Sequence, residues 1–231
     1  MVSEGIFILN QIINQILEKG KKLYVFFVDF SKAFDMVVHD NLWYKLLNIG
    51  ITGKMFSIIH SMYTCLKTCV MVNGEKSEAF YCQLGVRQGE CLSPFLFAMY
   101  INDLEKSLDT PDSGITILHV KFLLLLYADD VVIFANSSQN LQNSIDRLYD
   151  YCNRWKLTIN TSKSFIMIFS RRHMYTFETW KYGDTVIPVT THMKYLGLIF
   201  SCNGSPNHTQ LKLSQQANKA VFSLHKKLRT H

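Results

Sequence analysis

The sequence lacks the features that mark membrane spans, zinc clusters and disulfide frameworks. No apolar run approaches the length of about 20 residues that a membrane-spanning helix needs, and the best run carries Asp129 and Asp130 in its middle. The six cysteines contain no CxxC pair, and the eight histidines do not lie at zinc-ligand spacing near them. We therefore predict reduced thiols packed in the core of an intracellular protein without a membrane span.

The composition is that of a globular chain, without internal repeats or low-complexity segments. Of the 231 residues, 48% are hydrophobic and 13% are aromatic, which is enough for one large domain or two small ones with a sizeable core. The net charge is +6. A mild basic excess fits a polyanionic partner such as nucleic acid, although many proteins without such a partner carry the same balance.

Hydrophobic periodicity and turn residues predict helices mixed with short strands. Ser93 is expected to cap its helix, with Pro94 at the first helical position. These blocks predict an α+β fold with an antiparallel sheet and helices packed on one face. The expected helices span residues 5–18, 39–49, 52–66, 93–107 and 138–155; the expected strands span 22–30, 121–127, 131–135, 164–169, 176–182, 185–189 and 194–200, with a hairpin over 68–82 turning at Asn73-Gly74.

Three acids follow or interrupt apolar strands. Asp129 and Asp130 lie within FLLLLYADDVVIFA, where a hairpin turn would place both carboxylates at the end of the sheet instead of in the core. Asp29 closes the apolar strand KLYVFFVDF. Clustered acids are commonly compensated by divalent cations, so acids converging from neighbouring strand ends could hold two ions for a displacement at phosphorus.

Five segments of the chain, in order, resemble the conserved motifs of one enzyme family. Motifs A to E of the reverse transcriptases resemble, in turn, FVDFSKAFD, GVRQGECLSP, YADD, WKLTINTSKS and KYLGLIF. The wording is most similar to the enzymes of non-LTR (LINE-type) retrotransposons, whose motif A is followed by a histidine-aspartate pair, here His39-Asp40. The resemblance extends from about residue 4 to residue 228 and identifies the chain as a truncated member, centred on the palm.

The resemblance implies both a fold and an activity. Residues 1–200 would form a polymerase palm with partial fingers, and residues 201–231 the beginning of a thumb helix. The chain would be an RNA-directed DNA polymerase that extends a DNA primer on an RNA template with dNTPs. It would use two Mg²⁺ ions, with Mn²⁺ able to replace them. Because members of this family prime synthesis at chromosomal breaks, the resemblance also implies a nuclear location.

The resemblance also assigns roles at the catalytic centre. Asp29 and Asp129 would bind the metal ions, Asp130 would support the same site less directly, and the backbone carbonyl of Phe30 would complete one metal shell. Lys163 would lie near the leaving pyrophosphate and protonate it.

Further residues are assigned to the substrates. Phe34, five residues after Asp29, occupies the position of the steric gate that excludes a ribose 2′-hydroxyl. Gly89 would allow close approach of the backbone to the nascent base pair. The remaining assignments are Gln88 beside the nascent base pair and Tyr195, Leu196 and Gly197 as the primer grip.

Several of these residues, and the basic segment near the C-terminus, also have an alternative interpretation as purely structural. Asp35 is expected to make a structural hydrogen bond, Lys163 could be a surface lysine, and the basic segment after Thr209 could either follow a phosphate backbone or form a solvated helix face. At the level of the chain, the alternatives are a catalytically inactive, retrotransposon-derived nucleic-acid-binding fragment and a metal-dependent cyclase with a similar sheet. The oligomeric state is left open.

Overall fold

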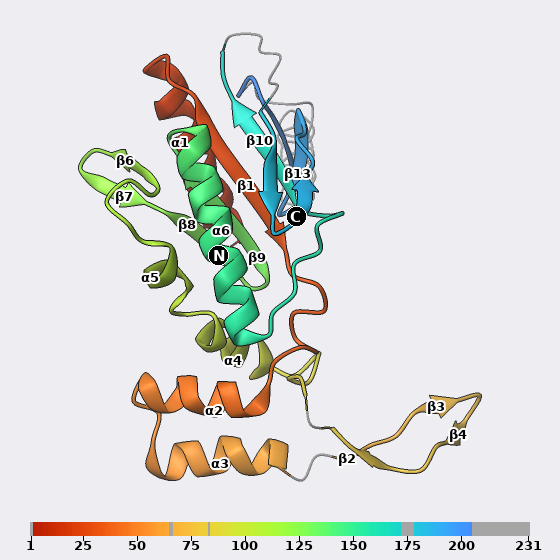
Figure 1. The fold of residues 1–231 in the computed structure, drawn as a ribbon. Coiled ribbons are helices and arrows are strands. Elements are labelled where there is room, and N and C mark those ends of the chain that lie inside the picture. The colour runs from red at the N-terminus through yellow and green to blue at the C-terminus, as the bar shows by residue number, and fades with distance from the viewer. Residues whose placement is uncertain (1, 65–66, 83, 172–177, 205–231) are drawn as a thin grey trace, which may run out of the picture.

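The fold is taken from a computed structural model, which describes residues 2–64, 67–82, 84–171 and 178–204. Its centre is a four-stranded sheet in the order β10-β1-β9-β8 (Figure 1). All neighbouring strands are antiparallel, and β1 pairs along almost its whole length with both β9 and β10. The four strands are β1 (Leu23–Asp29), β8 (Leu124–Tyr127), β9 (Asp130–Ala135) and β10 (Phe165–Phe169).

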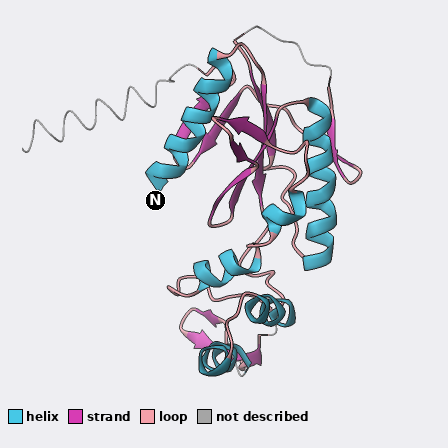
Figure 2. Ribbon diagram, turned by 90° about the vertical axis from the view of Figure 1, so that its left-hand side faces the viewer, coloured by secondary structure: helices cyan, strands magenta, loops and turns pink. Residues whose placement is uncertain are grey.

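Strand β1 is rich in apolar residues up to its last residue, Asp29, and both of its faces are buried. Phe26 and Val28 point into the cluster that includes α6 (Ser138–Trp155), whereas Val25 and Phe27 point into the cluster that includes α1 (Val2–Glu18). Figure 2 shows α1 and the long helix α6 on opposite sides of the sheet. The expectation of helices on one face is therefore wrong, while the α+β class with an antiparallel sheet is confirmed.

Helix α6 begins and ends where its sequence signals predict. The Ser137 hydroxyl accepts a hydrogen bond from the Asn140 backbone N–H at the N-cap, and Lys156 takes a left-handed conformation (φ 59°) at the C-cap. Leu141, Ile145 and Leu148 share one helix face and are fully buried. This spacing explains why the interval 138–155 could be predicted to the residue.

Three helices lie beyond the end of the sheet that carries the acids, and a fourth, short helix packs beside α6 (Figure 1). The first two precede a ribbon that extends away from the body and is built from short two-residue strands. The ribbon turns at Asn73-Gly74, as predicted, with both residues at positive φ. These elements are α2 (His39–Asn48), α3 (Gly53–Thr64), α4 (Ser93–Tyr100) and α5 (Leu104–Leu108), with β2 (Lys67–Thr68), β3 (Met71–Val72), β4 (Glu75–Lys76) and β5 (Phe80–Tyr81) in the ribbon.

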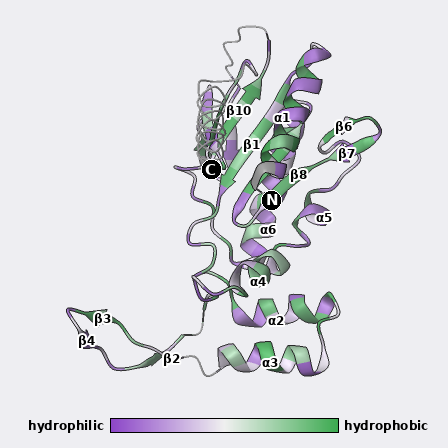
Figure 3. Ribbon diagram, turned by 180° about the vertical axis from the view of Figure 1, so that it is seen from behind, coloured by the Kyte–Doolittle hydropathy of each residue, from purple (hydrophilic) through white to green (hydrophobic). Residues whose placement is uncertain are grey.

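Three small hairpins complete the described part of the chain. Figure 3 shows the strong hydrophobic colouring of β1 and β10 in the central sheet. The hairpin β13-β14 contributes Tyr195, Leu198 and Phe200 to the apolar cluster around α1, so it covers the same face of the sheet. The hairpins pair β6 (Ile115–Ile117) with β7 (Val120–Phe122), β11 (Trp180–Tyr182) with β12 (Thr185–Ile187), and β13 (His192–Tyr195) with β14 (Leu198–Ser201).

Three expected elements differ from the structure. The strand expected over 121–127 is divided into β7, which pairs with β6, and β8, which belongs to the central sheet. The helix over 93–107 is divided into α4 and α5, and Ser93 does not cap it, because its hydroxyl donates to the Arg87 carbonyl at 2.5 Å. The strand over 194–200 is a hairpin that turns at Leu196-Gly197.

The cysteines also correct a prediction. Cys152 is buried as predicted, but Cys69 and Cys91 are exposed and do not contribute to the core. The basic segment after Thr209 lies outside the described residues. Among the helices that are described, none has the length and apolar character to cross a membrane.

Candidate active site

Two of the predicted acids face each other across the central strand pair. Asp29 is the last residue of β1 and Asp130 is the first residue of β9, and the two are register partners. Asp129 lies in the two-residue turn between β8 and β9, after Ala128, which has a positive φ of 53°. The prediction that a turn brings both acids to the end of the sheet is correct for Asp129, while Asp130 already belongs to the strand.

The acids interact electrostatically. Burial raises the pKa of the Asp130 carboxyl, and the negative charges of Asp129 and Asp29 raise it further. Like charges at neighbouring positions disfavour the ionised form unless a counter-charge is present. The three carboxylates therefore form one electrostatically coupled group at the strand ends.

Asp29 is held in place by the segment that precedes β10. Its backbone N–H donates to the Ser164 hydroxyl at 3.0 Å, and its carbonyl accepts from the Asn160 N–H at 2.8 Å. Ser164 is fully buried. Sequence reasoning missed Ser164, because nothing in its local pattern separates this serine from the other polar residues of TINTSKS.

A cavity of about 410 Å³ opens beside the acids. Asp29 and Asp130 line it together with Lys163, so the structure brings together three residues that the sequence places far apart. The turn of the β13-β14 hairpin forms another part of the wall. Lys194 also lines the cavity but was not predicted. The hairpin residues in the wall are Met193, Lys194, Tyr195, Leu196 and Gly197.

The predicted primer-grip segment is a tight hairpin. Leu196 (φ 47°) and Gly197 (φ 87°) occupy a two-residue turn with positive φ at both positions, which suits the twist of a hairpin. The Tyr195 ring packs on Phe27, with ring centroids 5.7 Å apart. Its hydroxyl is buried and has no hydrogen-bond partner among the residues that the structure describes. Burial, followed by the charge of Asp130 and by Tyr127, raises the pKa of Tyr195 to about 12.

The predicted steric-gate residue has an aromatic support. Phe34 is half-buried, and its ring centroid lies 5.3 Å from that of the fully buried Phe97 on α4. Phe30 is buried and contacts the same ring edge-on, at 6.2 Å. The orientation of Phe34 therefore depends on where α4 lies.

The loop that resembles motif B is hydrogen-bonded to the segment that follows Asp29. The Gly85 N–H donates to the Val37 carbonyl at 2.8 Å, and the Val86 N–H donates to the Phe34 carbonyl at 2.7 Å. His39 Nε2 donates to the Gly85 carbonyl at 2.8 Å. These bonds fix the start of the loop beside Phe34.

Gln88 and Gly89 lie further along this loop and do not line the cavity that holds the acids. Gln88 lines a second cavity of about 600 Å³ with Asp35 and Arg87, and its Nε2 lies 3.5 Å from Asp35 Oδ1. Gly89 has a positive φ of 90°, and a Cβ there would meet nothing within 4 Å. As far as the described residues go, the space over Gly89 is thus open to a ligand, whereas Gly85, in the same loop, is in close contact with the Asp35 backbone.

The chemistry of the acids suits a hard divalent cation. Carboxylate oxygens are the preferred ligands of Mg²⁺, and a cation would relieve the repulsion that raises the pKa of Asp130. Across the described residues, no group of three or more His, Cys, Asp or Glu side chains is gathered closely enough to hold a metal ion. The carboxylates could therefore supply ligands to a divalent cation, but these side chains alone do not complete its coordination shell.

The sheet with acids at its strand ends and helices packed on both sides is a polymerase palm-like fold. Residues 3–200 match the family described as reverse transcriptase (RNA-dependent DNA polymerase). The chain belongs to this family.

The relatives are polymerases of non-LTR retrotransposons, as the motifs predicted. The chain is 28% identical over 207 residues to the retrovirus-related Pol polyprotein from type-1 retrotransposable element R2 of Popillia japonica. This match covers 85% of the chain and 34% of the relative. The RNA-directed DNA polymerase from mobile element jockey of Drosophila funebris is 25% identical over 201 residues, covering 83% of the chain and 21% of the relative. The chain thus spans about a third or less of the length of these relatives.

Solved structures support the fold. The structure of apo telomerase from Candida tropicalis, truncated from the C-terminal domain, superimposes with a TM-score of 0.59 at 17% identity. It covers 84% of this chain, while the chain covers 38% of it. At this identity, the likeness concerns the fold alone.

Proposed function

We propose that this chain catalyses RNA-templated DNA synthesis, by attack of a primer 3′-hydroxyl on the α-phosphate of a dNTP. Membership of the reverse transcriptase family supports the reaction class. The observation that carries the proposal is the register pair Asp29 and Asp130, which lines one cavity with Lys163 and the β13-β14 turn. The carboxylates of Asp29 and Asp130, the side chain of Lys163 and the β13-β14 turn thus surround a single space.

The acids have the first role in the proposed mechanism. Asp29, Asp129 and the Phe30 carbonyl would hold two Mg²⁺ ions, with Asp130 in support. When bound, these ions supply neutralisation of the developing phosphate charge and activation of the 3′-hydroxyl. The Asp29 N–H donates to the Ser164 hydroxyl and the Asp29 carbonyl accepts from the Asn160 N–H, and these two bonds fix the end of β1, so little reorganisation of the backbone is required there.

Other residues would position the substrates. The hairpin turn at Tyr195, Leu196 and Gly197 would place the primer end over the acids, and Lys163 Nζ would donate a proton to the leaving pyrophosphate. Phe34 would exclude the 2′-hydroxyl of an rNTP, supported by its contact with Phe97. Gln88 and the open space at Gly89 would accommodate the nascent base pair beside Phe34.

The proposal is tested by extension of an oligo(dT) primer on poly(rA) with dTTP, with and without Mg²⁺. Asp129→Asn removes one charged ligand and keeps the shape of the side chain, so extension should fall about a hundredfold or more. Asp150→Asn is the matched control, because Asp150 is exposed on α6 and is not one of the acids at the strand ends. It should extend like the wild type.

Two results would count against the proposal. Extension that persists at the wild-type rate in Asp129→Asn would place the chemistry elsewhere. A folded wild-type protein that binds primer–template but adds no nucleotide with Mg²⁺ would instead favour a nucleic-acid-binding protein without turnover.

A further inference from the structure

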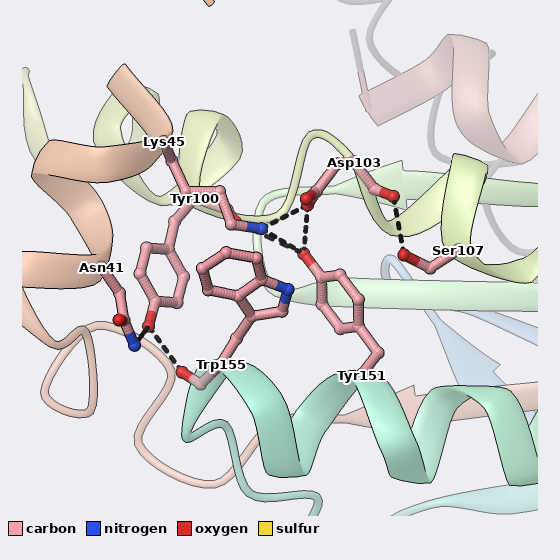
Figure 4. Close-up of polar contacts among 7 residues, drawn as sticks. All are labelled: Asn41, Lys45, Tyr100, Asp103, Ser107, Tyr151 and Trp155. Atoms are coloured by element: carbon pink, nitrogen blue, oxygen red, sulfur yellow. Dashed lines mark hydrogen bonds and ion pairs between the residues drawn. The ribbon is translucent and has the colours of Figure 1, made fainter. Parts of the chain in front are cut away.

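A buried lysine outside the cavity joins three helices. Lys45 on α2 is 4% exposed, and its Nζ donates to the Asp103 carboxylate and, at 3.0 Å, to the Tyr151 hydroxyl (Figure 4). The same ammonium lies 3.6 Å from the centroid of the Trp155 ring and 4.9 Å from that of Tyr151. Asp103 precedes α5, while Tyr151 and Trp155 belong to α6.

Tyr100 connects this group to α4. Its hydroxyl donates to the Trp155 carbonyl at 2.5 Å and accepts from Asn41 Nδ2, on α2, at 3.3 Å. Lys45 Nζ lies 5.7 Å from the centroid of the Tyr100 ring. We name Lys45, Asn41, Tyr100, Asp103, Tyr151 and Trp155 the lysine cluster; it holds the C-terminal end of α4 against α2 and α6 (Figure 4).

The helix held by the cluster also carries the support of the gate residue. Phe97 lies three residues before Tyr100, one turn earlier on α4, and it contacts Phe34 and Phe30. A shift of α4 would therefore move the Phe97 ring relative to Phe34.

Stability alone is a poor explanation for this arrangement. Burial lowers the pKa of Lys45, whereas the hydrogen bond and charge of Asp103 raise it. A buried ion pair is often replaceable by apolar side chains at no cost in stability, because desolvation offsets the attraction. What an ion pair adds is a directional constraint that apolar contacts lack.

We propose that the lysine cluster is a positioning device for α4 that keeps Phe97 against Phe34 and thereby sets discrimination between dNTPs and rNTPs. Lys45 acts through Phe97 and Phe34 and does not touch the nucleotide. This inference rests on the proposed function and extends it to a buried lysine, Lys45, that lies in none of the five motif segments.

Lys45→Met tests the proposal. Methionine has a similar length and packs well against aromatic rings, but it cannot bond to Asp103 or Tyr151. The ratio of kcat/KM for dTTP to kcat/KM for UTP should fall about tenfold in this variant, on the scale of coupling between contacting residues. Lys54→Met, an exposed lysine on α3, is the matched control and should keep the wild-type ratio.

A double-mutant cycle distinguishes an effect of Lys45 that is transmitted through Phe34 from a general loss of structure. Phe34→Ala should remove most of the discrimination, and Lys45→Met added to it should lower the ratio no further, because the ring through which Lys45 acts is gone. A wild-type ratio in Lys45→Met, or equal losses from Lys45→Met with and without Phe34, would overturn the proposal.

A second measurement needs no turnover. Amide hydrogen exchange across α4 should be faster in Lys45→Met than in the wild type, with exchange across α1 unchanged. Unchanged exchange across α4 overturns the positioning role. If the wild-type protein does not extend a primer at all, the proposed function fails, and the exchange result still decides whether Lys45 positions α4.

Discussion

Electrostatic repulsion among the carboxylates at the ends of β1 and β9 destabilises the folded state when all of them are ionised. Asp130 stands opposite Asp29 and next to Asp129 in the chain, and burial together with both charges raises its pKa. The raised pKa means that the folded state favours protonated Asp130 more than the unfolded state does. The associated stability is fully present below the pKa of the unfolded chain and is lost as the pH rises through the higher folded pKa.

Asp130→Asn should therefore stabilise the protein at pH 7 in the absence of divalent cations. The variant removes the repulsion without changing the shape of the side chain. A gain of about 0.5–1 kcal/mol in the free energy of unfolding is expected after allowance for solvent screening at this half-exposed site. Urea denaturation at pH 7 and at successively lower pH measures it, and the gain should shrink as Asp130 becomes protonated in the wild type. Equal stability of the two proteins at pH 7 would contradict the coupling.

Tyr195 offers a second test at the residue scale. Within the described part of the chain its buried hydroxyl finds no hydrogen-bond partner, and burying a polar group in this way ordinarily costs free energy. Tyr195→Phe should keep the ring contact with Phe27 and raise the free energy of unfolding by about 1 kcal/mol. Thermal or urea denaturation checks this, with Tyr151→Phe as a contrast that should destabilise, since the Tyr151 hydroxyl bonds to Lys45 and Asp103. A loss of stability in Tyr195→Phe would show that its hydroxyl has a partner in solution.

At the scale of elements, the positions of the strands and helices follow from local patterns, while their partners do not. The apolar run that ends at Asp29 and the periodicity over 138–155 were sufficient to place β1 and α6. The aromatic content of β1 could not reveal that α1 covers its second face, because burial on both faces depends on segments elsewhere in the chain. The division of the helix over 93–107 likewise has no Gly or Pro at the break to announce it.

Two glycines in the loop after β5 differ in what a side chain would meet: both have a positive φ, but only Gly85 also lies close to another part of the backbone. Gly85 has a φ of 88°, and an added Cβ would lie 3.0 Å from the Asp35 Cα and carbonyl oxygen, whereas Gly89 combines a similar φ with open space. Gly85→Ala should cost at least about 2 kcal/mol, and Gly89→Ala about 1 kcal/mol from left-handed strain alone. Urea denaturation of both variants ranks them. A larger loss for Gly89→Ala would mean that the loop packs differently from the structure.

At the scale of the whole molecule, distant segments assemble the candidate site. The segments that resemble motifs A, C, D and E each contain a predicted residue that lines the cavity beside the acids, whereas Gln88 and Gly89 of the motif B segment do not line it. The lysine cluster escaped prediction, since the bonds of Lys45 reach residues 58 and 106 positions away and involve no motif. Ser164 ends the segment that resembles motif D, but its bond to Asp29 spans 135 positions and could not be predicted from the local sequence.

Under the proposed function, this chain with its net charge of +6 should bind nucleic acid in a salt-sensitive manner. Lys163 and Lys194 both line the cavity beside the acids. Replacing both with alanine should weaken primer–template binding and reduce the slope of log K against log salt by about 2, one for each lost phosphate contact. Fluorescence anisotropy over a salt series measures the slope, and Lys54→Ala serves as the control outside the cavity. An unchanged slope would exclude both lysines from the phosphate contacts.

The central claim is that the acids at the ends of β1 and β9 form one divalent-cation site. The most direct measurement is the number of Mn²⁺ ions bound per chain, by electron paramagnetic resonance, with a dideoxy-terminated primer–template and dTTP present. We predict two ions for the wild type and for Asp150→Asn, and a loss of this binding in Asp29→Asn. Wild-type Mn²⁺ binding in Asp29→Asn would contradict the account, because the register pair with Asp130 would then have no part in holding the metal.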